Sequence, residues 1–325
     1  MTVIAALVSA STGALSGAAV PGPVASQERD AATARMPSAN TPPNVAILPN
    51  VEPCASTALT MLLVIDVGNT NIVYGLFEGL ALTHEFRVES GRGRTEDEFL
   101  VVLAELLNLH HVARSSVHAA IIASVVPALT EPMIAMTKKA FGVTPVVVTP
   151  DMDCGMLVRV DNPRELGADR IVNAVAAFAH TGMATVVVDF GTATTFDCVS
   201  QAGEYLGGVI VPGIQVAADA LSARAAKLPR VEIVKPLRVI GTNTLTAMQS
   251  GIVYGYVGLV DGLVTRLRAE MGTPCKVVAT GGLSRLIAPM TQGVDEVLPA
   301  LTLDGLRLLH ERATQSHPQS DAAAL

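Results

Sequence analysis

One short pattern occurs twice in this chain and constrains its fold more than any other feature. Leu63 to Thr70 and Val186 to Ala193 each contain three apolar residues, an aspartate, one apolar residue, a glycine and a small polar residue. A second apolar stretch follows each copy, at Ile72 to Phe77 and Thr194 to Val199. Each copy is therefore predicted to be a hairpin with Asp-x-Gly at its turn. Because the copies lie about one domain length apart, we expect two similar halves.

From Met61 onward, runs typical of strands alternate with runs of helical period. The predicted strands are Leu62 to Ile65, Ala119 to Ala123, Val146 to Val148, Thr185 to Val188, Gly208 to Val211 and Lys276 to Ala279. The predicted helices are Glu96 to Leu107, Thr130 to Phe141, Asp169 to His180, Ile214 to Ala226, Thr244 to Met271 and Leu303 to Thr314. This alternation predicts an α/β protein whose sheets are covered by helices.

We expect four parts along the chain. They are a disordered leader at 1–60, a first half at 61–180, a second half at 181–315 and a flexible tail at 316–325. The leader is rich in Ala, Ser, Thr and Pro and shows no sustained period. Because the ordered pattern begins on Met61, this methionine is a candidate translation start. The uncharged stretch from Thr2 to Gln27 begins without Lys or Arg and is interrupted by Gly and Pro, which disfavours a signal peptide or membrane span.

Composition disfavours several classes of function. With 22 basic and 29 acidic residues, the net charge is −7, which argues against binding to nucleic acid or to an acidic membrane. The chain has no Trp, four Tyr and seven Phe, so few aromatic rings are available to stack on bases. The cysteines, Cys54, Cys154, Cys198 and Cys275, form no C-x-x-C pair and are predicted to be ordinary reduced thiols.

The two Asp-x-Gly turns have the chemistry of a phosphate site. A buried strand that ends in Asp and turns through Gly exposes a carboxylate and backbone N–H groups, and the glycine lets a phosphate approach closely. One such turn could be only a hairpin, but two facing turns would clamp a polyphosphate and its cation. Gly281 and Gly282 follow a strand and could let a purine lie against the backbone, although Gly-Gly is more often a turn. The sequence contains neither a Walker loop nor a G-x-G-x-x-G after a strand.

The segment from Asn162 to Arg170 combines a helix-start signal with two charges. Asn162 is a candidate cap, Pro163 follows it, and Glu165 is at the third position. This segment places Asp169 and Arg170 at or near the start of an apolar-faced helix. The residues alone would also allow a helix-start charge and an exposed salt bridge.

The chain resembles the type III pantothenate kinases, a family of the acetate-and-sugar-kinase, heat-shock-cognate and actin superfamily. The resemblance covers Met61 to about Ala313 and rests on motifs in the family's order. They are Asp66-Val-Gly-Asn-Thr-Asn71, Thr95-Glu-Asp-Glu-Phe99, Ala123-Ser-Val-Val-Pro127, Asn162-Pro-Arg-Glu-Leu-Gly-Ala-Asp-Arg170, Asp189-Phe-Gly-Thr-Ala-Thr194, Gly241-Thr-Asn-Thr244 with Met248-Gln-Ser-Gly251, and Thr280-Gly-Gly-Leu283. The resemblance implies two ribonuclease-H-like (actin-like ATPase) halves with ATP in the cleft between them. It also implies phosphorylation of pantothenate to 4'-phosphopantothenate, the first step of coenzyme A synthesis.

The resemblance assigns roles to individual residues. Those implied for ATP are Asp66, Val67, Gly68, Asn69, Thr70, Asn71, Thr192, Gly281 and Gly282. Those implied for pantothenate are Val160, Gly167, Ala168, Asp169, Arg170 and Thr244. Asp169 would be the general base, and Asp189 would hold a monovalent cation, K⁺ or NH₄⁺, while Mg²⁺ accompanies ATP. At Val160 the family often has an aromatic residue, so the substrate pocket loses stacking area here.

Thr244 carries the implied quaternary structure. It matches a threonine that reaches the neighbouring subunit's substrate, which implies a homodimer, although Thr244 could instead cap the following helix. The apolar face of that helix, which includes Met248, Ile252 and Tyr256, would be either core or dimer seam. The resemblance also implies a cytoplasmic enzyme without nucleic-acid or membrane partners.

Two alternatives to the pantothenate kinase remain at this stage. A kinase of the same fold could act on a sugar or a short hydroxy acid, but the segment from Asn162 to Arg170 favours pantothenate. A non-catalytic ATP-binding regulator of the same fold would be favoured by loss of the base, but Asp169 is present.

Overall fold

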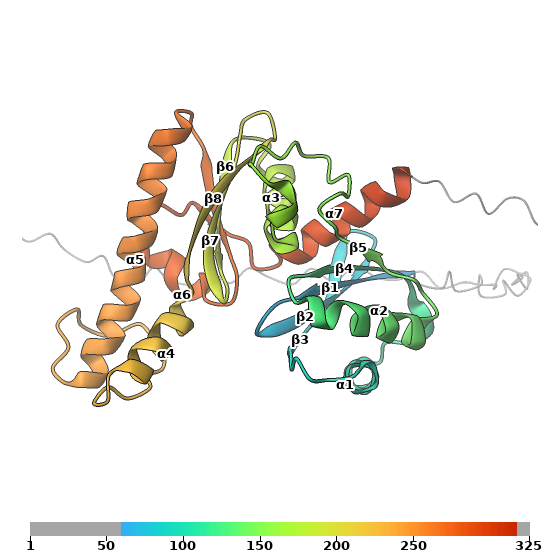
Figure 1. Ribbon diagram of the computed structural model, residues 1–325, viewed down its shortest axis with the longest axis horizontal. Coiled ribbons are helices and arrows are strands. Elements are labelled where there is room, and N and C mark those ends of the chain that lie inside the picture. Colours follow the sequence, from blue (N-terminus) through green and yellow to red (C-terminus); the bar gives the residue numbers. More distant parts are fainter. Residues whose placement is uncertain (1–59, 317–325) are drawn as a thin grey trace, which may run out of the picture. The chain divides into compact units, whose positions relative to one another are not determined.

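The computed structural model describes residues 60–316. The expectations for the leader, the candidate start and Cys54 concern residues before or at the edge of this range, and most of the expected tail follows it. Within it, Figure 1 shows two sheets with covering helices. The strands of the first are β1 (Met61–Val67), β2 (Asn71–Glu78), β3 (Ala81–Glu89), β4 (Val117–Ser124) and β5 (Val146–Val147). Those of the second are β6 (Thr185–Phe190), β7 (Ala193–Val199), β8 (Tyr205–Pro212), β9 (Lys276–Thr280) and β10 (Glu296–Val297).

The two sheets have the same topology. Their strand orders are β3-β2-β1-β4-β5 and β8-β7-β6-β9-β10. In each, the first three strands form an antiparallel meander, the fourth runs parallel to the first, and the fifth runs parallel to the fourth. Asp66 and Asp189 occupy equivalent positions, next to last in the central strands β1 and β6. The internal repeat therefore predicted two similar halves correctly, and the fold class that the resemblance implied, two ribonuclease-H-like halves, is confirmed.

All six predicted helices are confirmed, with small shifts at their ends. The helices are α1 (Glu96–Leu109), α2 (Pro127–Phe141), α3 (Ala168–Thr181), α4 (Ile214–Arg224), α5 (Thr244–Met271), the short α6 (Ser284–Ile287) and α7 (Leu301–Ser316). Capping boxes begin α1 at Thr95 and α5 at Asn243. Gly182 and Gly272, both left-handed, end α3 and α5. None of the helices within residues 60–316 combines the length and apolarity needed to cross a membrane.

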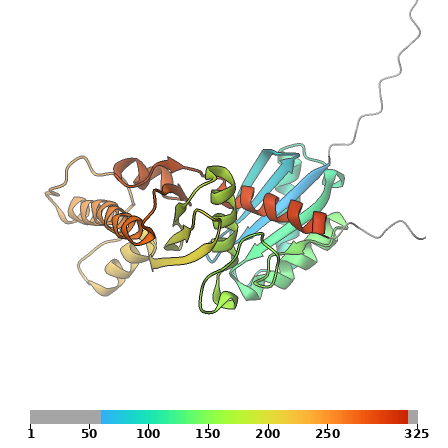
Figure 2. The same cartoon turned by 90° about the horizontal axis from the view of Figure 1, so that it is seen from above.

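Each sheet has its own apolar core. Leu63 and Ile65 of β1 pack with Phe99 of α1 and Met133 of α2, and Val186 of β6 packs with Val253 of α5 in the other half. Two further helices, α3 and α7, pack against each other. The helix α3 contacts β4, β6 and β7, whereas α7 contacts β1 and β4. Figure 2 shows α7 alongside the strands of the first sheet.

The packing of α7 adds to the expected division of the chain. The helix follows the second sheet in sequence, yet Leu306 and Leu309 share a buried cluster with Val64 of β1 and Ile121 of β4. The helix α7 therefore completes the core of the first half. The boundary expected between residues 180 and 181 stays a prediction.

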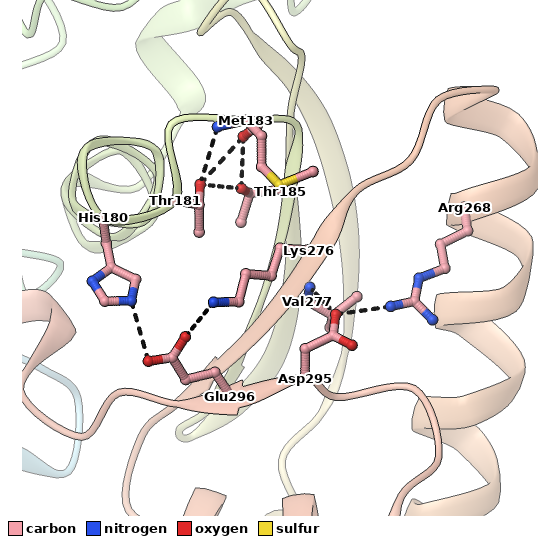
Figure 3. Close-up of polar contacts among 9 residues, drawn as sticks. All are labelled: His180, Thr181, Met183, Thr185, Arg268, Lys276, Val277, Asp295 and Glu296. Carbon is pink, nitrogen blue, oxygen red and sulfur yellow. Dashed lines mark hydrogen bonds and ion pairs between the residues drawn. The ribbon is translucent and has the colours of Figure 1, made fainter.

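Polar side chains hold the short edge strand β10 (Figure 3). Glu296 pairs with Lys276 of β9 at 2.6 Å and with His180 of α3 at 3.2 Å. Asp295, just before β10, accepts hydrogen bonds from Arg268 of α5 and from the backbone N–H of Val277. Since each exposed ion pair contributes little on its own, β10 depends on several such contacts together.

Candidate active site

The two Asp-x-Gly turns meet directly. The backbone N–H of Gly68 donates to the carbonyl of Asn71, and that of Gly191 donates to the carbonyl of Ala193, each at 3.0 Å. The hydroxyl oxygens of Thr70 and Thr192 lie 2.9 Å apart. The structure thus brings together the two turns that the sequence predicted to face each other, one from each half.

The first turn is braced by residues that sequence reasoning missed. The hydroxyl of Ser90 donates to the carbonyl of Gly68 at 2.6 Å, and Arg92 donates to Asn69 Oδ1 at 2.8 Å. Neither residue belongs to a recognisable motif, so the sequence offered no signal for them. The side chain of Val67 is fully buried in the core, so only its backbone is available to a nucleotide.

Three aspartates, Asp66, Asp169 and Asp189, form an electrostatically coupled cluster. Burial raises the pKa of Asp66 to about 7, and the charges of Asp169 and Asp189 add to the shift. Burial also raises the pKa of Asp189 to about 7, with further contributions from Asp169 and Asp197. The pKa of Asp169 is raised by burial too, against the opposing hydrogen bond and charge of Arg170. Clustered carboxyl groups with perturbed pKa values are typical of functional sites.

Asp169 stands at the beginning of α3. Gly167 is the N-cap, and the backbone N–H of Arg170 donates to Asp169 Oδ1 at 2.8 Å. A Cβ on Gly167 would lie 2.6 Å from that same oxygen, so glycine leaves room for the carboxylate. The preceding turn, Pro163–Glu165, is capped by Asn162 as predicted. The helix start therefore fixes where Asp169 points.

Arg170 is held by a buried carboxylate. Its Nε and Nη2 each lie 2.7 Å from Asp197 Oδ1, the hydroxyl of Tyr205 donates to the same oxygen at 2.7 Å, and Thr195 donates to Oδ2. The side chain of Asp197 is fully buried and that of Arg170 is 16% exposed. The alternative of an exposed helix-start salt bridge is therefore wrong. Sequence reasoning missed Asp197, although a lone acid within the apolar strand β7 was the available signal.

Asp189 lies between a buried amide and a glycine. Asn173 Nδ2 of α3 donates to Asp189 Oδ2 at 3.0 Å. On the other side, Gly281 has φ +88°, and a Cβ there would overlap Asp189 Oδ1. Gly282 has open space around it. The structure thus places Gly281 beside Asp189, while Gly282 faces outward.

A cavity of about 280 Å³ adjoins the start of α3. Gly167 and Ala168 line it, together with side chains from the ends of β4 and β5 and from the loop before α3, among them Ser124, Val148, Met152 and Leu166. Val160 is partly buried and packs against the same apolar cluster as Leu166. This cavity places apolar surface next to the candidate base.

Thr244 does not line the cavity beside α3. It is the exposed first residue of α5 and lines a different, apolar cavity of about 780 Å³ between α4 and α5. Asn243 is the N-cap, because its side chain accepts from the backbone N–H of Thr246 at 2.9 Å. The alternative that Thr244 caps this helix is therefore wrong.

Comparison with known proteins identifies the family. The model of the type III pantothenate kinase family matches residues 62–266. The chain belongs to the type III pantothenate kinase family. A type III pantothenate kinase from Moorella thermoacetica is 53% identical over 254 residues, which cover 78% of this chain and 100% of that protein. One from Geobacter sulfurreducens is 50% identical over 252 residues, which cover 78% of this chain and 99% of that protein.

Two solved structures are less similar to this chain than the two type III pantothenate kinases are. An inorganic polyphosphate/ATP-glucomannokinase from Arthrobacter sp. strain KM is 15% identical, with a TM-score of 0.41, and covers 79% of this chain and 99% of that one. The ethanolamine utilization protein EutJ from Carboxydothermus hydrogenoformans is 12% identical, with a TM-score of 0.44, and covers 76% of this chain and 89% of that one.

Proposed function

We propose that this chain transfers the γ-phosphate of ATP to pantothenate, which gives 4'-phosphopantothenate and ADP at the first step of coenzyme A synthesis. Family membership over nearly the full length of the relatives is the observation that carries the reaction. The geometry supports it, because two phosphate-type turns touch through Thr70 and Thr192 while a partly buried Asp169 stands beside an arginine.

Asp169 acts as the general base in the proposed mechanism. It accepts the proton of the primary hydroxyl of pantothenate, whose oxygen attacks the γ-phosphorus while the bond from that phosphorus to the β–γ bridging oxygen breaks and ADP leaves. The pKa of Asp169 is raised toward neutral pH. A general base is most effective when its pKa lies near the pH at which the enzyme works. The transition state is loose, so the main work of the protein is alignment.

Arg170 and the start of α3 position pantothenate. Asp197 engages Nε and Nη2 of Arg170, so the remaining N–H groups of the guanidinium are assigned to the substrate carboxylate. The backbone of Gly167 and Ala168 lines the adjoining cavity, whose apolar walls suit the methyl groups of pantothenate. The loop from Asp66 to Asn71 and Thr192 hold the phosphates, and Gly281 with Gly282 lies by the adenosine.

Asp189 and Asp66 fit hard cations. Both offer carboxylate oxygens in a cluster whose mutual repulsion a cation would relieve. No group of three or more His, Cys, Asp or Glu suited to a metal is found within residues 60–316. We therefore assign Asp189 to K⁺ or NH₄⁺ and expect the ATP phosphates to supply further ligands. Mg²⁺ bound with ATP would offset the phosphate charge.

We further propose a cytoplasmic homodimer in which Thr244 reaches the neighbouring subunit's pantothenate. Thr244 is exposed at the mouth of an apolar cavity, and Leu237, Ile240 and Leu245 nearby in sequence are exposed as well. Met248, Ile252 and Tyr256 are buried within the second half, so that part of the α5 face is core. The free thiols Cys154, Cys198 and Cys275 suit a reducing compartment.

A coupled ADP-release assay of the full chain with ATP, Mg²⁺ and pantothenate, in potassium and in sodium buffer, tests the proposal. We expect pantothenate-dependent turnover that rises with potassium. The variant Asp169→Asn should lose about 10²- to 10⁴-fold in turnover while still binding ATP. Near-normal turnover of this variant would remove Asp169 from the role of base.

The same assay separates the two alternatives. Turnover with a sugar or a short hydroxy acid but not with pantothenate would identify a different kinase. A folded, ATP-binding protein with no turnover on any acceptor would favour the non-catalytic regulator.

A further inference from the structure

A buried amide connects α7 to Asp189. Asn173 is 1% exposed and lies on α3. Its Nδ2 donates to Asp189 Oδ2 at 3.0 Å, and its Oδ1 accepts from the hydroxyl of Thr302 at 2.7 Å. One chain of hydrogen bonds therefore joins α7 to α3 and β6, which are neighbours in sequence but distant from α7.

The hydroxyl of Thr302 supports the orientation in which the donating end of the amide faces Asp189. A side-chain amide has one accepting and one donating end, and a carboxylate is favoured only by the donating end. Because Thr302 donates to Oδ1 of Asn173, the NH₂ group is turned toward Asp189. Without that hydroxyl, the buried oxygen would lack its partner and a reversed amide would place an oxygen against the carboxylate.

Close packing of α7 on α3 sets the distance between Thr302 and Asn173. Gly305, one turn further along α7, lies so near α3 that a Cβ on it would overlap the carbonyl oxygen of Val172. Gly305 and Val172 are both fully or nearly fully buried. The separation of the two helices at Thr302 and Asn173 is therefore set by backbone contact.

We propose that Thr302 and Asn173 are positioning residues that hold Asp189 for its cation. The amide holds Oδ2, so that Oδ1, on the side of Gly281, is presented to the ligand. This inference rests on the proposed role of Asp189 in binding a monovalent cation. A residue of α7, which packs on the first sheet, thus orients a cation ligand that belongs to the second sheet.

The potassium dependence of turnover tests the role of this pair. Thr302→Val keeps the shape of the side chain but removes the hydroxyl, and Thr302→Ser keeps the hydroxyl. For Thr302→Val we expect the potassium concentration at half-maximal turnover to rise about 5- to 30-fold, the loss equivalent to one buried hydrogen bond, while kcat at saturating potassium stays within about threefold. Thr302→Ser should restore the wild-type value. Thr314→Val, the same change at an exposed position of α7, is the matched control.

A second measurement does not depend on the cation. In protein labelled with ¹⁵N at asparagine, the Asn173 side-chain signal is identified by its loss in Asn173→Leu, and its exchange with water is followed. We expect slow exchange in the wild type and in Thr302→Ser, and exchange at least about tenfold faster in Thr302→Val.

The two measurements separate failure of this inference from failure of the cation site. If wild-type turnover responds to potassium and Thr302→Val has the wild-type half-saturation, the positioning role is wrong although the cation site stands. If wild-type turnover ignores potassium, the cation role of Asp189 is wrong, and the positioning of its carboxylate is then decided by the amide exchange. Unchanged exchange in Thr302→Val would overturn it.

Discussion

At the scale of single residues, this site concentrates negative charge where water is scarce. Asp66, Asp169 and Asp189 all have raised pKa values, and burial is the largest cause for each. By contrast, Asp197 has a buried arginine and a tyrosine hydroxyl as partners. Asp169 and Asp189 accept hydrogen bonds, but none of the three acids forms an ion pair within residues 60–316. They therefore suit a site whose positive partners arrive with the ligand, whereas Asp197 organises the protein itself.

Replacing Asp66 should stabilise the unliganded protein at high pH. Asp66 binds a proton up to about pH 7 when folded but only to 3.8 when unfolded, so between these values the folded state holds more protons and stability falls as pH rises. Asp66→Asn removes this loss. We expect it to be more stable than the wild type by on the order of 1–3 kcal/mol at pH 8, with the gap closing toward pH 4. Thermal unfolding across that range measures it, and a gap independent of pH would contradict it.

Arg170→Lys should weaken pantothenate binding specifically. A lysine has no planar fork and cannot engage both Asp197 and a substrate carboxylate in the same way. We expect KM for pantothenate to rise about 10- to 100-fold, with little change in KM for ATP. Arg159→Lys, at an exposed arginine that pairs with Glu204, is the control and should leave both constants near the wild-type values. Equal rises in both constants for Arg170→Lys would point to general damage.

At the scale of elements, helix ends and turns were predictable because their signals are local. Capping residues and apolar periodicity located every long helix within a few residues. The edge strand β3 was missed because it is largely polar: Thr83, His84, Glu85 and Arg87 lie in it, and Phe86 alone among its nine residues is buried. Its register on β2 makes it a strand. The two-residue β10 was missed because it is too short for a periodic pattern, and it forms only by pairing with β9 and by side-chain contacts with Lys276 and His180.

The paired glycines after β9 should differ sharply when substituted. At Gly281 the backbone is left-handed and a Cβ would overlap both Asp189 Oδ1 and the backbone of Phe190, whereas Gly282 has open space. We expect Gly281→Ala to lower kcat/KM for ATP at least about tenfold and to reduce stability by about 1–3 kcal/mol. Gly282→Ala should stay within about twofold of the wild type. Equal effects of the two substitutions would show that the contact between Gly281 and Asp189 does not limit activity.

At the scale of the whole molecule, the same five-stranded unit is used twice, and helices α3 and α7 lie in the buried clusters that the two halves share. Residues of the candidate site come from both units: Asp66 from β1, Asp189 from β6 and Asp169 from α3. Such a site requires both halves to be folded. The proposed homodimer adds a further contribution, Thr244, from the neighbouring subunit.

Mixed dimers test whether Thr244 acts across the subunit boundary. Thr244→Val and Asp169→Asn should each be nearly inactive as homodimers. In a co-expressed mixture, half of the dimers combine the two variants, and each of these contains one intact site, so about a quarter of wild-type activity should return. Differently tagged subunits confirm that exchange has occurred. No recovery in an exchanged mixture would place Thr244 outside the neighbour's site.

Two similar units, the long helices and the pair of Asp-x-Gly turns could be predicted from the sequence, because apolar period, capping residues and a repeated motif are all local patterns. The sequence also placed Asp169 at a helix start. Only the tertiary structure revealed that Asp197 holds Arg170, that Ser90 braces Gly68, and that α7 completes the first sheet. These contacts join residues far apart in the chain, and their existence depends on which side chains are buried together once the sheets and helices have packed.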